Sequence, residues 1–228
     1  MANILNIDTS THICSVALAV DGNLLFNKEY RLNSQHAAWL GVFVKEAINF
    51  TRENLLKIDA IAISGGPGSY TGLRIGVSEA KGLCYGLDIP LIAVSSLRIM
   101  ADEVFRSGCK ADYFCPMIDA RRMEVYTAVY DAKLQELQAV SSEIITENLF
   151  ADYLSAGKVL FFGDGSKKCK PVILSPYALF KEDVYPLAAS MIHLSERMFN
   201  EGKFEDIAYY EPFYLKEFIA TVAKNKVL

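Results

Sequence analysis

Residues 58–76 read IDAIAISGGPGSYTGLRIG. The mostly apolar run from Ile58 to Ser64 predicts a short buried strand. Gly65-Gly66-Pro67-Gly68 then marks a tight turn, and the residues from Tyr70 to Leu87 predict a helix. A buried strand that turns directly into a long helix is typical of an α/β protein.

The turn itself allows two interpretations. Backbone N–H groups at the start of the helix could bind an anion, or the turn is purely structural, with Ser69 or Thr71 as the helix N-cap. No Gly-Lys-Ser/Thr follows, so the turn is not a P-loop, and Thr71 stands where a dinucleotide-binding pattern needs its third glycine. The structural interpretation is favoured.

Outward from this unit, the order strand-strand-strand-helix-strand-helix occurs twice, on either side of Ser107-Gly108-Cys109-Lys110. In the first half the expected elements are strands 4–7, 15–20 and 24–31, helix 36–50, strand 58–64, helix 70–87, strand 90–95 and helix 97–106. In the second half they are strands 113–118, 124–130 and 139–146, helix 147–156, strand 159–162 and helix 187–200. The repeat predicts two α/β lobes, each with a mixed sheet flanked by helices.

Such a duplication is the plan of the actin, hexokinase and Hsp70 superfamily, in which a nucleotide lies between the lobes, although a fold does not fix a function. We expect an N-terminal lobe at residues 1–107 and a C-terminal lobe at residues 108–228. The last helix is expected to pack back on the first lobe.

The amino-acid composition argues against several classes of function. The net charge is −4 and the pI is near 5.5, so the chain is a poor candidate for the main phosphate-neutralising surface of a nucleic-acid-binding protein. Local basic spots occur at Arg121-Arg122 and at 167–170, and we interpret both as solvated loops or helix ends. The five cysteines form no C-x-x-C pair. No signal peptide or membrane span is apparent, which predicts a cytoplasmic protein without membrane contact.

A cleft between the lobes would be lined by the ends of corresponding strands. Asp8 ends the first strand of one half and Asp119 ends that of the other. Asp8 could face a phosphate and a metal, or it could cap the hairpin turn that follows it. The predicted vestigial nucleotide cleft comprises Asp8, Ser10, Gly66, Gly68, Asp119, Gly163 and Gly165.

Catalytic and metal-binding patterns are missing from the sequence. The histidines are His12, His36 and His193, and the residue four positions after His36 is Leu40, so no H-x-x-x-H face forms. No G-x-S-x-G elbow or Ser-His-Asp grouping stands out. We therefore predict no catalytic residue, no metal and no cofactor.

Two helices have compositions that packing on one side of a sheet does not explain. Residues 37–44 read AAWLGVFV, which is apolar on all sides, whereas a helix on a sheet normally has one apolar stripe. The helix 70–87 contains four glycines, each of which costs about 1 kcal/mol relative to alanine. A partner surface would explain both features, and on this basis Gly76→Leu should block pairing and leave a folded monomer. The predicted interface comprises His36, Ala37, Trp39, Leu40, Phe43, Gly72, Leu73, Ile75, Gly76 and Ala80.

These motifs converge on a family. Ile7-Asp8-Thr9-Ser10, residues 65–76, residues 80–83, residues 90–97 and residues 118–126 resemble the TsaB (YeaZ) family, and Pro212 to Lys216 looks like its terminal motif. The resemblance spans nearly the whole chain and is densest over residues 58–126. It implies a duplicated actin-like fold of the ASKHA, ribonuclease H-like kind.

The resemblance also implies a function. TsaB-like proteins are inactive relatives of TsaD, the subunit that transfers a threonylcarbamoyl group to a tRNA adenosine, and they pair with TsaD through their first two helices. The expected partners are therefore a TsaD-type catalytic subunit, a TsaE-type ATPase on that pair, a second copy of the chain in isolation, and tRNA only through the complex. TsaB-like chains often have His-Ser-Glu where this chain has His36-Ala37-Ala38.

Two other functions stay open on the sequence. The alternative to a non-catalytic subunit is an actin-like ATPase or phosphotransferase that acts alone through Asp8, Asp119 and the glycine turns. The third is a stand-alone metallopeptidase.

Overall fold

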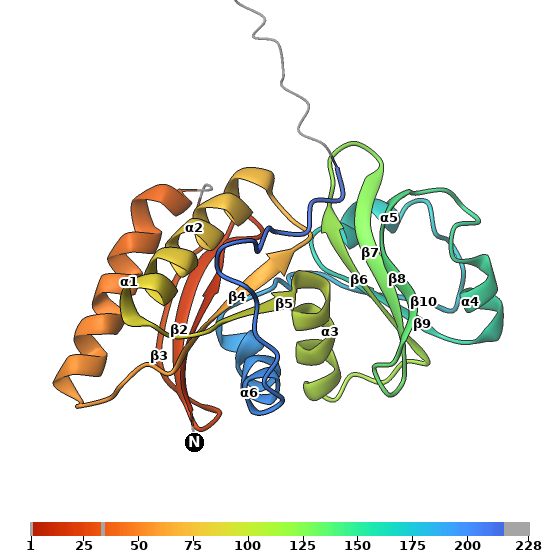
Figure 1. Ribbon diagram of the computed structural model, residues 1–228. Coiled ribbons are helices and arrows are strands. Elements are labelled where there is room, and N and C mark those ends of the chain that lie inside the picture. Colours follow the sequence, from red (N-terminus) through yellow and green to blue (C-terminus); the bar gives the residue numbers. More distant parts are fainter. Residues whose placement is uncertain (1, 33–34, 217–228) are drawn as a thin grey trace, which may run out of the picture.

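The computed structural model describes residues 2–32 and 35–216, which form two mixed five-stranded sheets (Figure 1). The first sheet has the order β3-β2-β1-β4-β5, with β1 (Asn3–Asp8), β2 (Cys14–Val20), β3 (Asn23–Tyr30), β4 (Ala60–Gly66) and β5 (Leu91–Ser95). The second has the order β10-β9-β6-β7-β8, with β6 (Tyr113–Asp119), β7 (Glu124–Asp131), β8 (Glu136–Ile144), β9 (Val159–Phe162) and β10 (Ala178–Lys181).

The two sheets repeat one topology. β1 pairs antiparallel with β2 and parallel with β4, and β6 pairs antiparallel with β7 and parallel with β9. β5 and β10 extend the parallel side, and β3 and β8 extend the antiparallel side. The predicted duplication of two α/β lobes is therefore confirmed.

The helices form three layers around the two sheets (Figure 1). α1 (His36–Glu53) and α2 (Tyr70–Leu87) cover the outer face of the first sheet, and α4 (Ala151–Ala156) and α5 (Ser166–Cys169) lie against the second. Between the sheets, α3 (Ser96–Arg106) packs against β4, β5, β6 and β7. The short 3-10 helix η1 (Ala189–Met191) leads into α6 (Ile192–Asn200), which packs against β1 and β5 of the first sheet.

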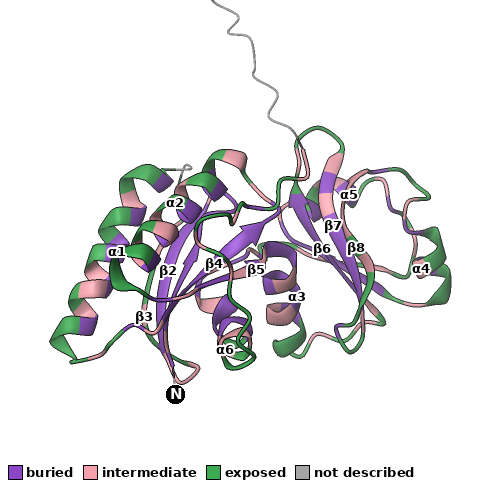
Figure 2. Cartoon of the chain, viewed as in Figure 1, coloured by how far each residue is buried: buried purple, intermediate pink, exposed green. Residues whose placement is uncertain are grey.

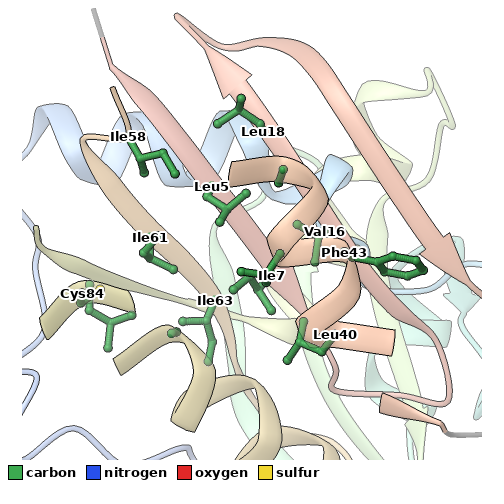
Figure 3. Close-up of a cluster of buried hydrophobic side chains, with 14 of the residues drawn as sticks. Leu5, Ile7, Val16, Leu18, Leu40, Phe43, Ile58, Ile61, Ile63 and Cys84 are labelled. Carbon is green, nitrogen blue, oxygen red and sulfur yellow. The ribbon is translucent and has the colours of Figure 1, made fainter. Parts of the chain in front are cut away.

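The core of the first lobe explains why its central strands read as continuous apolar runs. β4 is buried along its whole length because α2 covers one face and α3 the other. Leu5, Ile7 and Val16 of the sheet meet Leu40 and Phe43 of α1 (Figure 3). Figure 2 shows the same contrast, with buried strands beneath helices whose outer faces are exposed.

The second half of the chain departs from the predicted order of elements. α5 and β10 were not predicted, because each has only four residues and lacks a periodic apolar pattern. As a result, the predicted helix 187–200 is the counterpart of α3, and α5 takes the position of α2. The lobe boundary at residues 107 and 108 stays a prediction, and residues 217–228 of the predicted second lobe lie outside the described residues.

After α6 the chain returns across the first lobe as an irregular segment, residues 205–216, which we call the strap. Glu205 N–H donates to Leu91 O at 2.9 Å, and Phe213 N–H donates to Gly65 O at 2.8 Å. Lys81 Nζ of α2 donates to the carbonyls of Ala208 (3.3 Å) and Tyr210 (3.1 Å). The strap therefore runs from β5, past α2, to the turn that follows β4 (Figure 1).

Candidate functional site

Most residues of the predicted partner interface lie in the core of the first lobe. Ala37 is exposed, Trp39 and Ile75 are half-buried, and the other seven are buried: His36, Leu40, Phe43, Gly72, Leu73, Gly76 and Ala80. A side chain buried inside its own lobe cannot form an outer surface. For these seven residues, the placement at a contact surface is corrected. The use of the two helices for pairing stays a prediction.

The glycines Gly72 and Gly76 are explained by an internal contact. A Cβ atom at Gly72 would lie closer than 3.0 Å to Thr9 O, and one at Gly76 would lie that close to Thr9 Oγ1. Thr9 Oγ1 donates a hydrogen bond to Gly72 O at 2.8 Å. The turn after β1 thus approaches the backbone of α2 directly, and Gly76→Leu is expected to disturb the fold, contrary to the sequence-based expectation.

His36 belongs to the same internal contact. Its Nε2–H donates to Thr11 O at 2.8 Å, and burial lowers the pKa of the imidazole, which favours the neutral ring. Because the ring is held by a backbone carbonyl, His36 ties the start of α1 to the turn after β1.

The exposed sides of α1 and α2 include several small and apolar residues. Gly41, Gly82 and Gly86 have open space where a Cβ would stand. We call the following exposed residues the helix-pair face: Ala37, Ala38, Gly41 and Val42 of α1, and Ser78, Gly82, Tyr85 and Gly86 of α2. Lys45 and Arg74 are the exposed charged residues among these turns. The glycines of α2 therefore divide into an internal pair and an external pair.

A cleft of about 770 Å³ lies between the lobes. Its walls come from the turn after β1, the start of α2, the β6–β7 turn and the end of the strap. The lining residues are Ser10, Thr11, His12, Gly68, Ser69, Tyr70, Thr71, Ile118, Asp119, Ala120, Arg121, Arg122, Glu124, Tyr126, Asp164, Phe213, Tyr214, Leu215 and Lys216.

Three of the seven residues predicted for this cleft line it, namely Ser10, Gly68 and Asp119. Gly66 has φ +106°, which favours glycine, and a Cβ there would lie 2.7 Å from Phe213 O of the strap. Gly163 and Gly165 pack against the backbone of Met117 and Ile118 in β6. Gly66, Gly163 and Gly165 therefore serve close packing. Neither these glycines nor the buried Asp8 line the cleft, which corrects their predicted placement.

The glycine-rich turn supplies the N-cap of the helix that follows it. Ser69 is the N-cap of α2, and its Oγ accepts a hydrogen bond from Gly72 N–H at 3.3 Å. Ser69 N–H in turn donates to Ser10 O at 2.7 Å. Of the two N-cap candidates in the sequence, Ser69 is the cap, and Thr71 is exposed in the first turn of the helix.

Asp8 is completely buried beneath the cleft. Burial raises the pKa of its carboxyl group to about 7, although hydrogen bonding from Ser10 opposes the shift. Ser10 Oγ donates to Asp8 Oδ2 at 2.9 Å, and Ser10 N–H donates to Oδ1 at 3.3 Å. The carboxyl group therefore caps the turn after β1, the second of the two roles considered for it.

The Asp119 carboxylate forms an ion pair with a lysine. Lys168 Nζ of α5 lies 2.6 Å from Asp119 Oδ1 and also donates to Arg122 O (2.8 Å) and Glu124 O (2.6 Å). Asp119 N–H donates to Asp164 Oδ1 at 2.9 Å. Burial raises the pKa of the Asp164 carboxyl group. An ammonium group thus sits where a second-lobe acid would otherwise be free to hold a cation.

Several cleft residues were not predicted as such. Arg121 and Arg122 stood out in sequence as a basic pair, but their spacing gave no sign that the turn points into a cleft. Asp164 lies between two predicted glycines, and Lys216 ends the strap and forms an ion pair with Glu124. Nothing in a linear pattern indicates that residue 216 returns to residue 124.

The described residues contain neither a metal-binding cluster nor a membrane-spanning helix. Within residues 2–32 and 35–216, no group of three or more His, Cys, Asp or Glu side chains could hold a metal ion. No helix in the described part of the chain is long and apolar enough to cross a membrane.

Two lobes of one repeated topology, with a cleft between them, define the duplicated actin-like, ribonuclease H-like class of α/β protein. Residues 31–224 match the family model described as TsaD, tRNA N6-adenosine threonylcarbamoyltransferase. The chain is 35% identical over 228 residues to the tRNA threonylcarbamoyladenosine biosynthesis protein TsaB of Escherichia coli (strain K12), which covers 95% of this chain and 96% of that protein. The chain therefore belongs to the TsaB (YeaZ) family, and it shares the domain that the TsaD model describes.

Two further comparisons agree with this assignment. The solved structure of YeaZ from Pseudomonas aeruginosa superimposes with a TM-score of 0.78 at 30% identity, covering 94% of this chain and 100% of that one. The tRNA N6-adenosine threonylcarbamoyltransferase of Carboxydothermus hydrogenoformans is 28% identical over 249 residues, which cover 90% of this chain and 69% of that protein.

Proposed function

We propose that this chain is a non-catalytic subunit in tRNA threonylcarbamoyladenosine biosynthesis, which binds a TsaD-type catalytic subunit and activates it. The proposal draws on relatives that are named TsaB biosynthesis proteins and on the match to the TsaD model.

The observation that carries the proposal is the helix-pair face. Exposed glycines inside a helix each cost about 1 kcal/mol relative to alanine, and at Gly41, Gly82 and Gly86 no contact within the described chain offsets that cost. Small residues on a helix let another backbone approach closely. Tyr85 and Arg74, exposed beside them, are residue types that anchor protein interfaces. A partner helix packed on this face would account for the composition.

The absence of catalysis is supported by the two acids considered for an actin-like ATPase. Asp8 is buried and caps a turn, and Asp119 forms an ion pair with Lys168. In both cases the carboxyl group is already used within the chain. Neither acid is therefore free for the role that the ATPase alternative assigns to it.

In the proposed complex, a TsaE-type ATPase binds the pair formed by this chain and the TsaD-type subunit. The chain associates with tRNA only through this complex. In isolation, the helix-pair face is expected to pair with a second copy of the chain, because a self-complementary patch gives a symmetric dimer.

The binding claim is tested with the TsaD-type protein of the same organism. The two proteins are mixed and analysed by size-exclusion chromatography with light scattering, using the wild-type chain, Gly82→Arg and the control Ala156→Arg. Gly82 lies on the helix-pair face, whereas Ala156 is an exposed small residue of α4 in the second lobe. We expect a complex with the wild type and the control and loss of complex with Gly82→Arg.

The same variants separate binding from folding. Arginine has a higher helix propensity than glycine, so Gly82→Arg should raise the stability of the isolated chain by roughly 0.5–1 kcal/mol. A Gly82→Arg chain that is stable and still forms the complex would contradict the proposed surface.

A further inference from the structure

The strap carries an exposed aromatic side chain that the proposed function does not yet use. Tyr209 is 85% exposed, whereas Phe213 and Tyr214 further along the strap are 50% and 36% exposed. Its neighbours Ile207 and Tyr210 pack against the core of the first lobe. The strap is therefore held on the lobe by the residues around Tyr209, and the Tyr209 ring itself stands in solvent.

The backbone at Tyr209 is fixed in a turn. The Asp206 carboxylate accepts hydrogen bonds from Ala208 N–H at 2.8 Å and from Tyr209 N–H at 3.3 Å. Tyr210 N–H donates to Asp206 O at 2.8 Å. An aspartate that binds the backbone N–H groups following it is a common way to fix a turn. The ring of Tyr209 is thus exposed, but the backbone that carries it is held in place.

Lys81 fixes this turn to α2 (Figure 1). Its ammonium group donates to the carbonyls of Ala208 and Tyr210, the residues on either side of Tyr209. Tyr85 of the helix-pair face follows Lys81 by four residues, and residues at this spacing are neighbours on one side of a helix. Tyr85 is 86% exposed. Two exposed tyrosines, one from α2 and one from the strap, therefore lie beside the same lysine, and the helix-pair face continues onto the strap.

Aromatic side chains at this position complement the rest of the face. The helix-pair face consists mainly of small residues, which let a partner backbone approach but offer it little contact area. Tyrosine is one of the residue types whose truncation costs the most at protein interfaces. A backbone that is fixed before binding also loses less conformational entropy when the partner arrives. The two tyrosines can thus supply the bulky contacts that the glycines cannot.

We propose that Tyr85 and Tyr209 form one aromatic anchor for the TsaD-type subunit, and that Lys81 is the positioning residue for Tyr209. The inference rests on the proposed function, because it takes that subunit as the occupant of the helix-pair face. It extends the contact surface from two helices to a third element, the strap. A partner that covers Tyr85 meets Tyr209 next, because the same lysine joins the two elements.

The anchor is tested by measuring the affinity of the full chain for the TsaD-type protein of the same organism. That protein is labelled with a fluorophore, kept at low concentration and titrated with each variant. We expect Tyr209→Ala and Tyr85→Ala each to weaken binding by roughly ten- to thirtyfold. The matched control is Tyr177→Ala, which truncates an exposed tyrosine of the second lobe and should bind as the wild type does. Urea unfolding checks that every variant is folded.

Lys81→Met tests the positioning role. Methionine keeps an unbranched apolar side chain and removes the donor to both carbonyls of the strap. We expect Lys81→Met to weaken binding by roughly three- to tenfold in the wild-type background and to have little effect when Tyr209 is already alanine. An equal loss in both backgrounds would overturn the positioning role, because Lys81 would then act independently of Tyr209.

The outcomes separate this inference from the proposed function. A wild-type chain that forms no complex would contradict the proposed function and the inference together. A complex that Tyr85→Ala weakens and Tyr209→Ala leaves unchanged would overturn the inference alone. The same holds if Tyr209→Ala impairs only the dimer of the isolated chain, measured by light scattering, because the strap would then contact a second copy and not the TsaD-type subunit.

Discussion

The contact between Thr9 and α2 makes a quantitative prediction about two glycines of one helix. Gly82→Ala adds a methyl group in open space, so helix propensity alone should stabilise the chain by up to about 1 kcal/mol. Gly76→Ala gains the same propensity but places Cβ closer than 3.0 Å to Thr9 Oγ1. Overpacking of this kind costs about 1–3 kcal/mol, and the β-branched threonine, which is 2% exposed, has little room to turn away.

Gly76→Ala should therefore be less stable than Gly82→Ala by about 1–3 kcal/mol. Urea unfolding of both variants, with unchanged slopes, measures the difference. A double-mutant cycle with Thr9→Ala locates the cause of this difference in stability. Thr9→Ala removes the clashing oxygen and should restore most of the stability that is lost in the Gly76→Ala background. Equal stabilities of the two glycine variants would refute the view that the turn after β1 packs directly on α2.

Two further predictions concern the buried and paired acids. Asp8 has a pKa raised by burial from its ordinary 3.8 to about 7, so between these values the folded chain holds a proton that the unfolded chain releases. Its contribution to stability is thus complete below about pH 4 and is lost as pH rises to about 7, with a slope of up to roughly 1.4 kcal/mol per pH unit. Asp8→Asn should remove this dependence. Urea unfolding at pH 5 and pH 8 should therefore show a smaller decrease in the free energy of unfolding for the variant than for the wild type. An equal decrease in both proteins would rule out the raised pKa of Asp8. Lys168→Met should lower the free energy of unfolding by about 1–3 kcal/mol, since it removes the hydrogen bonds that hold the β6–β7 turn. Lys167→Met, at the exposed neighbouring position, is the control. Equal unfolding midpoints for the two variants would show that the turn does not depend on Lys168.

Much of the fold could be predicted from local patterns. The apolar run before Gly65 and the glycine-rich turn predicted β4 and α2, and the predicted bounds of α2, Tyr70 and Leu87, are those of the structure. The order of elements also predicted the duplication, because each lobe begins with three strands and a helix. Four-residue elements such as β10 could not be found this way, since their pairing with β9 is a long-range property of the sheet.

The candidate surfaces were harder to predict because burial depends on which turn meets which helix. The four glycines of the helix 70–87 indicated close approach but did not say to what. The structure assigns the approach at Gly76 to Thr9, a residue far away in sequence, and leaves Gly82 exposed. The same limit applies to the cleft, where Lys168 neutralises Asp119 across distant segments.

The central claim is that the chain activates a TsaD-type subunit without catalysing the reaction itself. The most direct test measures threonylcarbamoyl transfer to tRNA by the purified TsaD-type protein of the same organism, alone, with the wild-type chain, and with Gly82→Arg. The account predicts transfer with the wild-type chain, little transfer without it, and a low rate with Gly82→Arg. Transfer at the full rate by the TsaD-type protein alone would contradict it.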